Sequence, residues 1–143
     1  MLTFEEAVEK VRKDYPGNLI RTGCETPDEY RFQVSPGKYY AIDDLAVLTV
    51  VVDKKTGKTR SEGMYDLSNR YDDIRDLDRI YKMMRKTRRP VDLTKEQWEE
   101  YLLWCGAEDP SMDTSKMSDE EIEAINAARR RSKEMHKKLN SMK

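Results

Sequence analysis

Residues 45–52 read Leu-Ala-Val-Leu-Thr-Val-Val-Val, and residues 53–60 read Asp-Lys-Lys-Thr-Gly-Lys-Thr-Arg. The first run consists almost entirely of residues that favour β-structure, which predicts a central strand of a sheet. The second run is polar and contains Gly57, which can take the positive φ that a tight turn needs. We therefore expect the chain to turn there and to return over residues 58–63 as a polar strand near an edge of the sheet.

The residues before this hairpin predict a helix and two further strands. Apolar side chains recur at helical spacing between Thr3 and Tyr15, and Thr3 with Glu6 has the spacing of a capping box. Residues 19–22 and 29–34 have the pattern of short strands. Residues 1–66 are therefore expected to form an α+β core, with an N-terminal helix on an antiparallel sheet of three or four strands.

The second half of the chain changes to a helical period. A three-four spacing of apolar residues predicts a helix over residues 70–86, and Thr94 with Gln97 opens a second helix that ends near Gly106. Ser118 then opens a last helix. The expected fold is α+β with three helices after the sheet: two in residues 67–106, packed on the core, and one in residues 107–143, after a loop.

The charge of the chain is high but balanced. Of the 143 residues 38% are charged, yet 27 Lys and Arg stand against 28 Asp and Glu, which argues against purely electrostatic attachment to nucleic acid or membrane. No run approaches the roughly 18 apolar residues of a membrane-spanning helix, and the start lacks the features of a secretory signal. We expect a cytoplasmic protein without membrane contact, in which Cys24 and Cys105 are free thiols.

Two basic clusters stand out against the neutral total. Their members are Lys82, Arg85, Lys86, Arg88 and Arg89 in the first, and Arg129, Arg130, Arg131 and Lys133, continued by Lys137 and Lys138, in the second. On one face they could neutralise several phosphates and bind nucleic acid in a salt-dependent way. The structural alternative is that acids precede bases along each helix, as the helix dipole favours.

The sequence contains two patterns of acidic residues that occur in metal-dependent enzymes, but neither indicates such an enzyme here. Asp72, Asp73 and Asp76 have the spacing with which isoprenoid synthases hold magnesium, but the chain is too short for their large helical bundle. Asp44 and Asp53 would suit a metal-dependent nuclease, yet a strand between them would hold them roughly 30 Å apart. We therefore expect no enzymatic activity, no catalytic residues, no metal and no cofactor.

Aromatic residues are more numerous than one helix-on-sheet core needs. Tyr and Trp often anchor protein interfaces, so Tyr65, Tyr71 and Trp104 are the candidate protein-binding residues. Trp104 is the strongest of them because it falls off the apolar face of its helix.

The C-terminal helix has few apolar residues. Its three-four row ends in Met135, Leu139 and Met142, with Ser132 and Ala128 as weak members. The simplest interpretation is a partly solvated helix, and the main competitor is a helix that needs a partner. A homodimer through this helix is one arrangement that the spacing allows.

Residues 1–64 resemble small bacterial and phage α+β proteins, among them immunity proteins of toxin systems, through their helix, their strands and the hairpin Val52-Asp53-Lys54-Lys55-Thr56-Gly57-Lys58. The resemblance implies a protein that covers a target's active or nucleic-acid-binding surface stoichiometrically. We therefore expect a non-enzymatic inhibitor or immunity-type factor that docks on a protein target, for example a phage counter-defence inhibitor of a nucleic-acid-handling enzyme. The alternative is a nucleic-acid-binding accessory protein that uses the two basic clusters.

Overall fold

The computed structural model describes residues 1–36, 48–63, 65–107 and 113–142, without the side chains of residues 104–107. The chain groups into two compact units, which we call unit 1 (Met1–Gly63 and Met83–Pro110) and unit 2 (Met64–Lys82 and Ser111–Lys143). The division falls inside one helix. It follows different boundaries from the expected segments 1–66, 67–106 and 107–143, because residues 64–82 group with the C-terminal helix.

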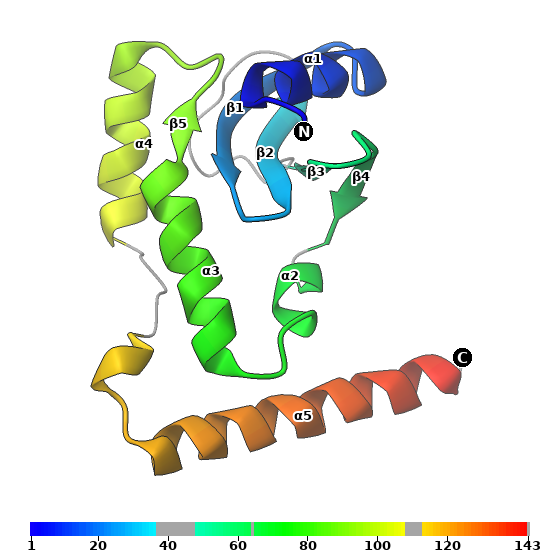
Figure 1. Ribbon diagram of the computed structural model, residues 1–143, viewed down its shortest axis with the longest axis vertical. Helices are drawn as coiled ribbons and strands as arrows, with labels where there is room; N and C mark the ends of the chain where they lie inside the picture. Colours follow the sequence, from blue (N-terminus) through cyan, green and yellow to red (C-terminus); the bar gives the residue numbers. More distant parts are fainter. Residues whose placement is uncertain (37–47, 64, 108–112, 143) are drawn as a thin grey trace. The chain divides into compact units, whose positions relative to one another are not determined.

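Unit 1 begins with helix α1 (Phe4–Asp14), which lies across the sheet in Figure 1. Its start is fixed by the predicted capping box: Oγ1 of Thr3 accepts from the backbone N–H of Glu6, and the Glu6 carboxylate accepts from the N–H of Thr3. Ala7, Val8 and Val11 form its buried face, as their spacing predicts.

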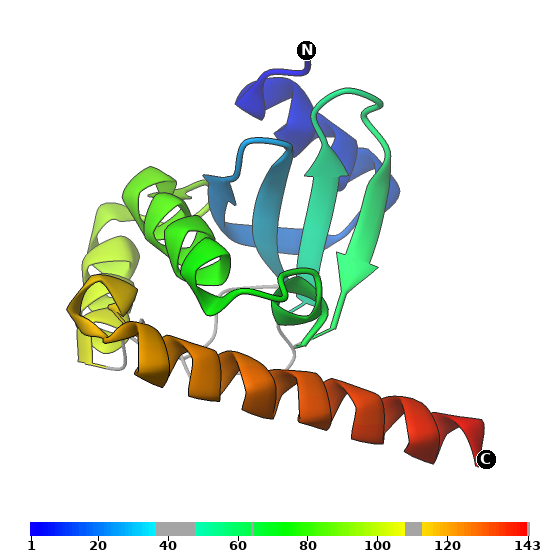
Figure 2. The same cartoon turned by 60° about the horizontal axis from the view of Figure 1, so that its bottom comes forward.

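The sheet has five antiparallel strands in the order β4-β3-β2-β1-β5. The strands are β1 (Asn18–Glu25), β2 (Glu29–Pro36), β3 (Leu48–Asp53), β4 (Thr59–Glu62) and β5 (Arg89–Pro90). The predicted returning strand, β4, lies at an edge, and Gly57 takes a φ of 72° in the turn before it. Figure 2 shows this hairpin at the side of the sheet.

One detail of the predicted sheet needs correction, and another falls partly outside the described residues. The strand count is five because the two-residue strand β5, which comes after the helix that follows the sheet, pairs with Thr22 and Gly23 of β1. No local pattern marks so short a strand. The predicted central strand began at Leu45, but β3 is described only from Leu48, and residues 45–47 lie outside the described part of the chain.

One face of the sheet forms the apolar core with α1. The cluster consists of Ala7, Val8, Val11, Ile20, Tyr30, Phe32, Val34, Val50 and Val52. Tyr30 is buried in this cluster, and its hydroxyl donates to the carbonyl of Leu2 at 3.0 Å. Phe4 lies against both Tyr30 and Phe32, with ring centroids 5.7 and 5.3 Å away.

The opposite face of the sheet contains a buried group of charged side chains. Nη2 of Arg31 donates to Glu62 at 2.6 Å and Nη1 donates to Glu29 at 3.4 Å, while Arg60 donates to both carboxylates. Arg31, Glu29 and Glu62 are all buried. Removing one partner of such a group leaves an uncompensated charge and costs about 3–5 kcal/mol.

The rest of unit 1 follows the sheet in sequence. Helix α3 (Ile74–Thr87) ends in this unit, and helix α4 (Lys95–Ala107) begins at the predicted box of Thr94 and Gln97. Tyr101 of α4 donates to Oε1 of Gln33 at 2.9 Å. Asp92 accepts from the backbone N–H of Ile20 at 2.7 Å and from Arg12 at 2.6 Å, which ties the segment after β5 to β1 and α1.

Unit 2 consists of short helix α2 (Asp66–Asn69), the first turns of α3, the turn η1 (Thr114–Lys116) and helix α5 (Asp119–Ser141). α2 is a helix that the sequence did not predict. α5 starts at Ser118, as expected, where Oγ accepts from the N–H of Glu121. Among the described residues, no helix is long and apolar enough to cross a membrane.

Gly23 gives a direct test of the core. A Cβ atom there would lie 2.6 Å from Cζ of Phe4 and 2.8 Å from Cε1 of Phe32. We expect Gly23→Ala to lower the free energy of unfolding by about 1–3 kcal/mol, because two packed rings must move. Urea titration followed by circular dichroism measures this, with Lys13→Ala on the exposed side of α1 as the control; equal stability of both variants would contradict the packing.

Candidate functional site

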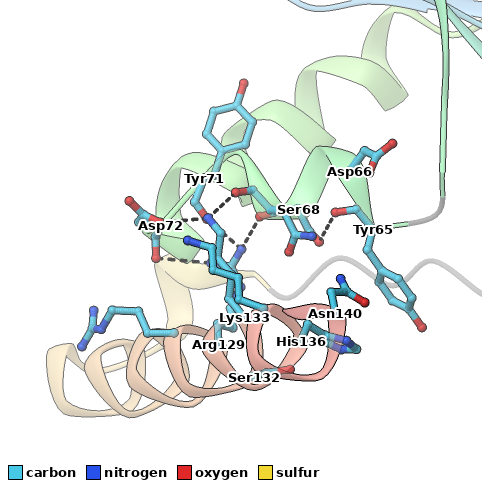
Figure 3. Close-up of a pocket in the computed structure, with 13 residues that line it drawn as sticks. Tyr65, Asp66, Ser68, Tyr71, Asp72, Arg129, Ser132, Lys133, His136 and Asn140 are labelled. Atoms are coloured by element: carbon cyan, nitrogen blue, oxygen red, sulfur yellow. Dashed lines mark hydrogen bonds and ion pairs between the residues drawn. The ribbon is translucent and has the colours of Figure 1, made fainter. Parts of the chain in front are cut away.

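A hollow in unit 2 lies between α5 and the segment that contains α2. It has a volume of about 620 Å³ and is lined by residues from two ranges, 65–72 and 129–140 (Figure 3). Its lining includes Tyr65 and Tyr71, the carboxylates Asp66 and Asp72, and several cationic residues of α5. The fold thus brings the second basic cluster beside two of the three predicted protein-binding residues, although some 60 residues separate them in sequence.

Arg129 joins the two walls of this hollow. Its Nη2 donates to the backbone carbonyls of Ser68 at 2.7 Å and Tyr71 at 2.8 Å, and its Nη1 donates to that of Asp72 at 3.4 Å. These carbonyls belong to the end of α2 and the turn after it, and that of Ser68 also accepts from the backbone N–H of Tyr71 at 3.4 Å. The Arg129 guanidinium therefore serves a structural role at the back of the site.

Asn126 makes a second attachment one turn earlier on α5. Its Oδ1 accepts from the first N–H of α3, that of Ile74, at 2.8 Å, and its Nδ2 donates to Asp73 at 3.3 Å. Asp73 itself accepts from the side chain and the backbone of Arg75, and these contacts hold the pKa of that carboxyl well below its usual range. A side chain of α5 thus caps the start of α3.

Other cations of α5 are also engaged within the unit. Nζ of Lys133 donates to the carbonyl of Asn69 at 2.6 Å and lies 3.5 Å from Asp72, and Arg130 pairs with Glu123 at 3.1 Å. Arg131 is exposed. His136 and Lys137 also line the hollow and are exposed there. The floor of the hollow is thus fixed by hydrogen bonds, and its exposed lining carries both signs of charge, with Asp66 and Asp72 beside Arg130 and Lys137.

The predicted protein-binding residues differ in their setting. Tyr65 stands at the start of α2 and is 67% exposed, and its ring points toward the level of α5 in Figure 3. Tyr71 is half-buried, and its ring points away from α5. The side chain of Trp104 lies outside the described residues. Tyr65 is therefore the aromatic group that the site presents most openly.

The first basic cluster is divided between the units. Lys82 belongs to unit 2, where it pairs with Asp78 at 2.9 Å and Asp113 at 3.0 Å. Arg85, Lys86, Arg88 and Arg89 belong to unit 1. There the Arg89 guanidinium lies 3.7 Å from the centre of the Phe4 ring, and that of Arg88 lies 5.9 Å from the Tyr101 ring.

Carboxylates of unit 2 hold the chain just before α5. Asp78 is buried and accepts from the N–H and hydroxyl of Thr114, at 3.3 and 3.0 Å. Asp113 caps η1 by accepting from Ser115. Within the described residues, no group of three or more His, Cys, Asp or Glu side chains could hold a metal ion.

Sequence reasoning missed Asn126 as a site-forming residue. The signal was present, because Ile122, Asn126, Arg129 and Lys133 recur at intervals of four, three and four, which places them on one face of α5. The expected pattern for an inward face is apolar, and a face with one isoleucine and three polar residues does not match it.

Replacing Arg129 tests the attachment of α5. We expect Arg129→Ala to lower the free energy of unfolding by about 1–3 kcal/mol, because three carbonyls lose a charged donor. Arg129→Lys should not restore the loss, since an ammonium cannot reproduce the planar fork. Urea titration measures both, with Arg131→Ala as the matched control; similar stability of the Arg129 and Arg131 variants would show that these bonds contribute nothing.

The contacts of Asp113 predict a dependence on pH. Hydrogen bonds from Ser115 and then from Lys82 lower the pKa of Asp113 from 3.8 to about 2. A lowered pKa in the folded state means that the charged form stabilises the fold above about pH 4, and that this stabilisation is lost as the pH falls toward 2. Asp113→Asn should therefore be less stable than the parent at pH 7, and the difference should shrink at pH 2.5. A difference that does not change with pH would exclude the carboxylate's charge as its cause.

Comparisons with known proteins add no family to this description. No protein-family model matches the chain, and neither the curated proteins nor the solved structures gave a match. The function of the site is therefore argued from its own residues.

Proposed function

We propose that this protein acts without catalysis, by binding another protein, and that the hollow of unit 2 with its rim is the docking surface. The observation that carries this proposal is the exposed ring of Tyr65 at the edge of a concave, mostly hydrogen-bonded site that also presents cations. Tyr and Arg are enriched at the energetic centres of protein interfaces.

The mixed charge of the site favours a protein partner. Asp66 and Asp72 line the hollow together with Arg129, Arg130, Lys133 and Lys137. A protein surface can present both signs of charge and apolar groups, whereas the charges on a nucleic-acid backbone are all negative. Arg129 and Lys133 are bound to backbone carbonyls of the same unit, which leaves them less able to neutralise phosphates.

An inhibitor or immunity-type factor is the specific form of this proposal. Such a protein works by covering its target, which requires a stable surface and no reactive group. The hydrogen bonds of Asn126, Arg129 and Lys133 would give the surface a fixed shape before binding, and a preformed surface loses less entropy on association. The expected targets include enzymes that handle nucleic acid.

Direct nucleic-acid binding is the second candidate, and one observation favours it. The exposed cation Lys137 lies in the same hollow as Tyr65, and basic grooves with aromatic rings bind single strands. In that case affinity would fall steeply as salt rises, because counterions are released on binding.

Affinity capture from a lysate of the native host separates these candidates. Tagged protein is used with and without nuclease, at two salt concentrations, and bound proteins are identified by mass spectrometry. We expect one stoichiometric protein that survives nuclease, and we expect Tyr65→Ala to weaken its binding by about 30-fold, as for a residue at the energetic centre of an interface.

Leu103→Ala is the control for this experiment, because Leu103 is a large apolar residue of unit 1 that is 79% exposed, more than Tyr65. Capture that Leu103→Ala reduces and Tyr65→Ala leaves intact would place the docking surface elsewhere. Nucleic acid released by salt, with no dominant protein, would overturn the proposal in favour of the second candidate.

A further inference from the structure

We propose that the C-terminal half of α5 binds an acidic amphipathic helix of the protein partner. This inference rests on the proposed function and names the class of segment that the partner offers. The binding face is the row Ser132, Met135, Leu139 and Met142, which we call the α5 row.

The α5 row is a helix face that the described chain leaves in solvent. Every residue from Glu134 to Met142 is exposed, and Met135, Leu139 and Met142 are 63, 54 and 81% exposed. They follow one another at intervals of four and three, which places them on one side of the helix. An isolated helical end of this length gains little stability by itself in water, and an apolar partner would stabilise it.

The residues on either side of the α5 row are mostly basic, which favours a partner helix with acidic residues. In a helix pair the residues just before and just after the apolar positions face the neighbouring helix. In α5 these are Arg131 and Lys138, both exposed, on one side, and His136 on the other, where the Arg129 guanidinium is already bound to backbone carbonyls of unit 2. Residues 129–142 contain six Lys or Arg and a single acid, Glu134. A partner helix with Glu or Asp on its flanks would meet opposite charge at Arg131 and Lys138.

The same charges argue against a second copy of this chain. In a parallel or an antiparallel pair of α5 helices, the basic flank positions would face each other. Ser132 adds a small polar residue at the centre of the row. A homodimer through α5 would therefore combine repulsion with a weak apolar seam.

A membrane surface is a poorer occupant than an acidic helix. Basic amphipathic helices do bind anionic lipids, but they usually insert Trp, Phe or several Leu residues. The described part of the α5 row offers three large apolar side chains and no aromatic one. A second helix, by contrast, needs only a narrow apolar row to pack against, as in a two-stranded coiled coil.

The α5 row is continuous with the hollow of unit 2. Ser132 belongs to the row and also lines the hollow, and His136 lines the hollow from the adjacent flank. Figure 3 shows both on the α5 side of the site. A single partner could therefore lay a helix along the row while another part of it contacts Tyr65.

The test uses the full chain and designed peptides as probes. The first peptide has three heptads with Leu at the core positions and Glu at the flanks, the second has the same composition in scrambled order, and the third has Lys in place of Glu. Binding is measured by fluorescence anisotropy at low and high salt. We expect the first peptide to bind, more weakly at high salt, and at least tenfold more tightly than either control peptide.

Leu139→Asp should weaken binding of the acidic peptide at least tenfold, whereas Leu103→Asp, at an exposed leucine of α4, should leave it unchanged. Circular dichroism of both variants checks that they are folded. Sedimentation of the parent protein should show a monomer, and vesicles of anionic lipid should not bind it. Self-association abolished by Leu139→Asp, binding to the vesicles, or equal binding of the scrambled peptide would overturn the inference.

These results are separable from those on the proposed function. A captured protein whose binding needs Tyr65 but is unaffected by Leu139→Asp would retain the proposed function and remove this inference. Loss of capture with Leu139→Asp as well as with Tyr65→Ala would support both.

Discussion

Asn126 and Arg129 attach α5 to the turn between α2 and α3, and the surface of unit 2 depends on that attachment. The only buried residues of α5 are Ile122 and Asn126, so apolar burial cannot hold a helix of this length. The helix is instead held by hydrogen bonds to this turn: Asn126 caps α3, and Arg129 donates to three carbonyls. Losing a hydrogen bond to a charged group is costly. These few contacts therefore hold the two walls of the hollow together.

Much of the fold could be predicted from local sequence. Capping boxes place the starts of α1 and α4, and the positive φ of Gly57 follows from the turn that precedes β4. These features were predictable because the decisive interactions lie within three or four residues along the chain. The apolar face of α1 follows for the same reason, since its period alone identifies it.

Features that depend on distant residues could not be predicted. Arg31 has the position of an outward residue on β2, yet it is buried with Glu62, 31 residues away. To predict that an ion pair is buried, one must know what covers that face of the sheet, and the residue pattern of a single strand does not contain this information. Strand β5 and the hollow could not be predicted for the same reason, because each is formed by segments that are remote in sequence. Of the site, the sequence identified Tyr65 and the cations of α5, but it did not identify their proximity.

Hydrogen exchange along α5 in the free protein tests the central claim most directly, because it reports local opening of each amide. If polar contacts hold the helix only as far as Lys133, amides from Ile125 to Lys133 should exchange slowly, and those from Met135 to Met142 should exchange quickly at every protein concentration. Slow exchange along the whole helix that strengthens with concentration would contradict the account, because it would mean that the α5 row is already covered by a second copy.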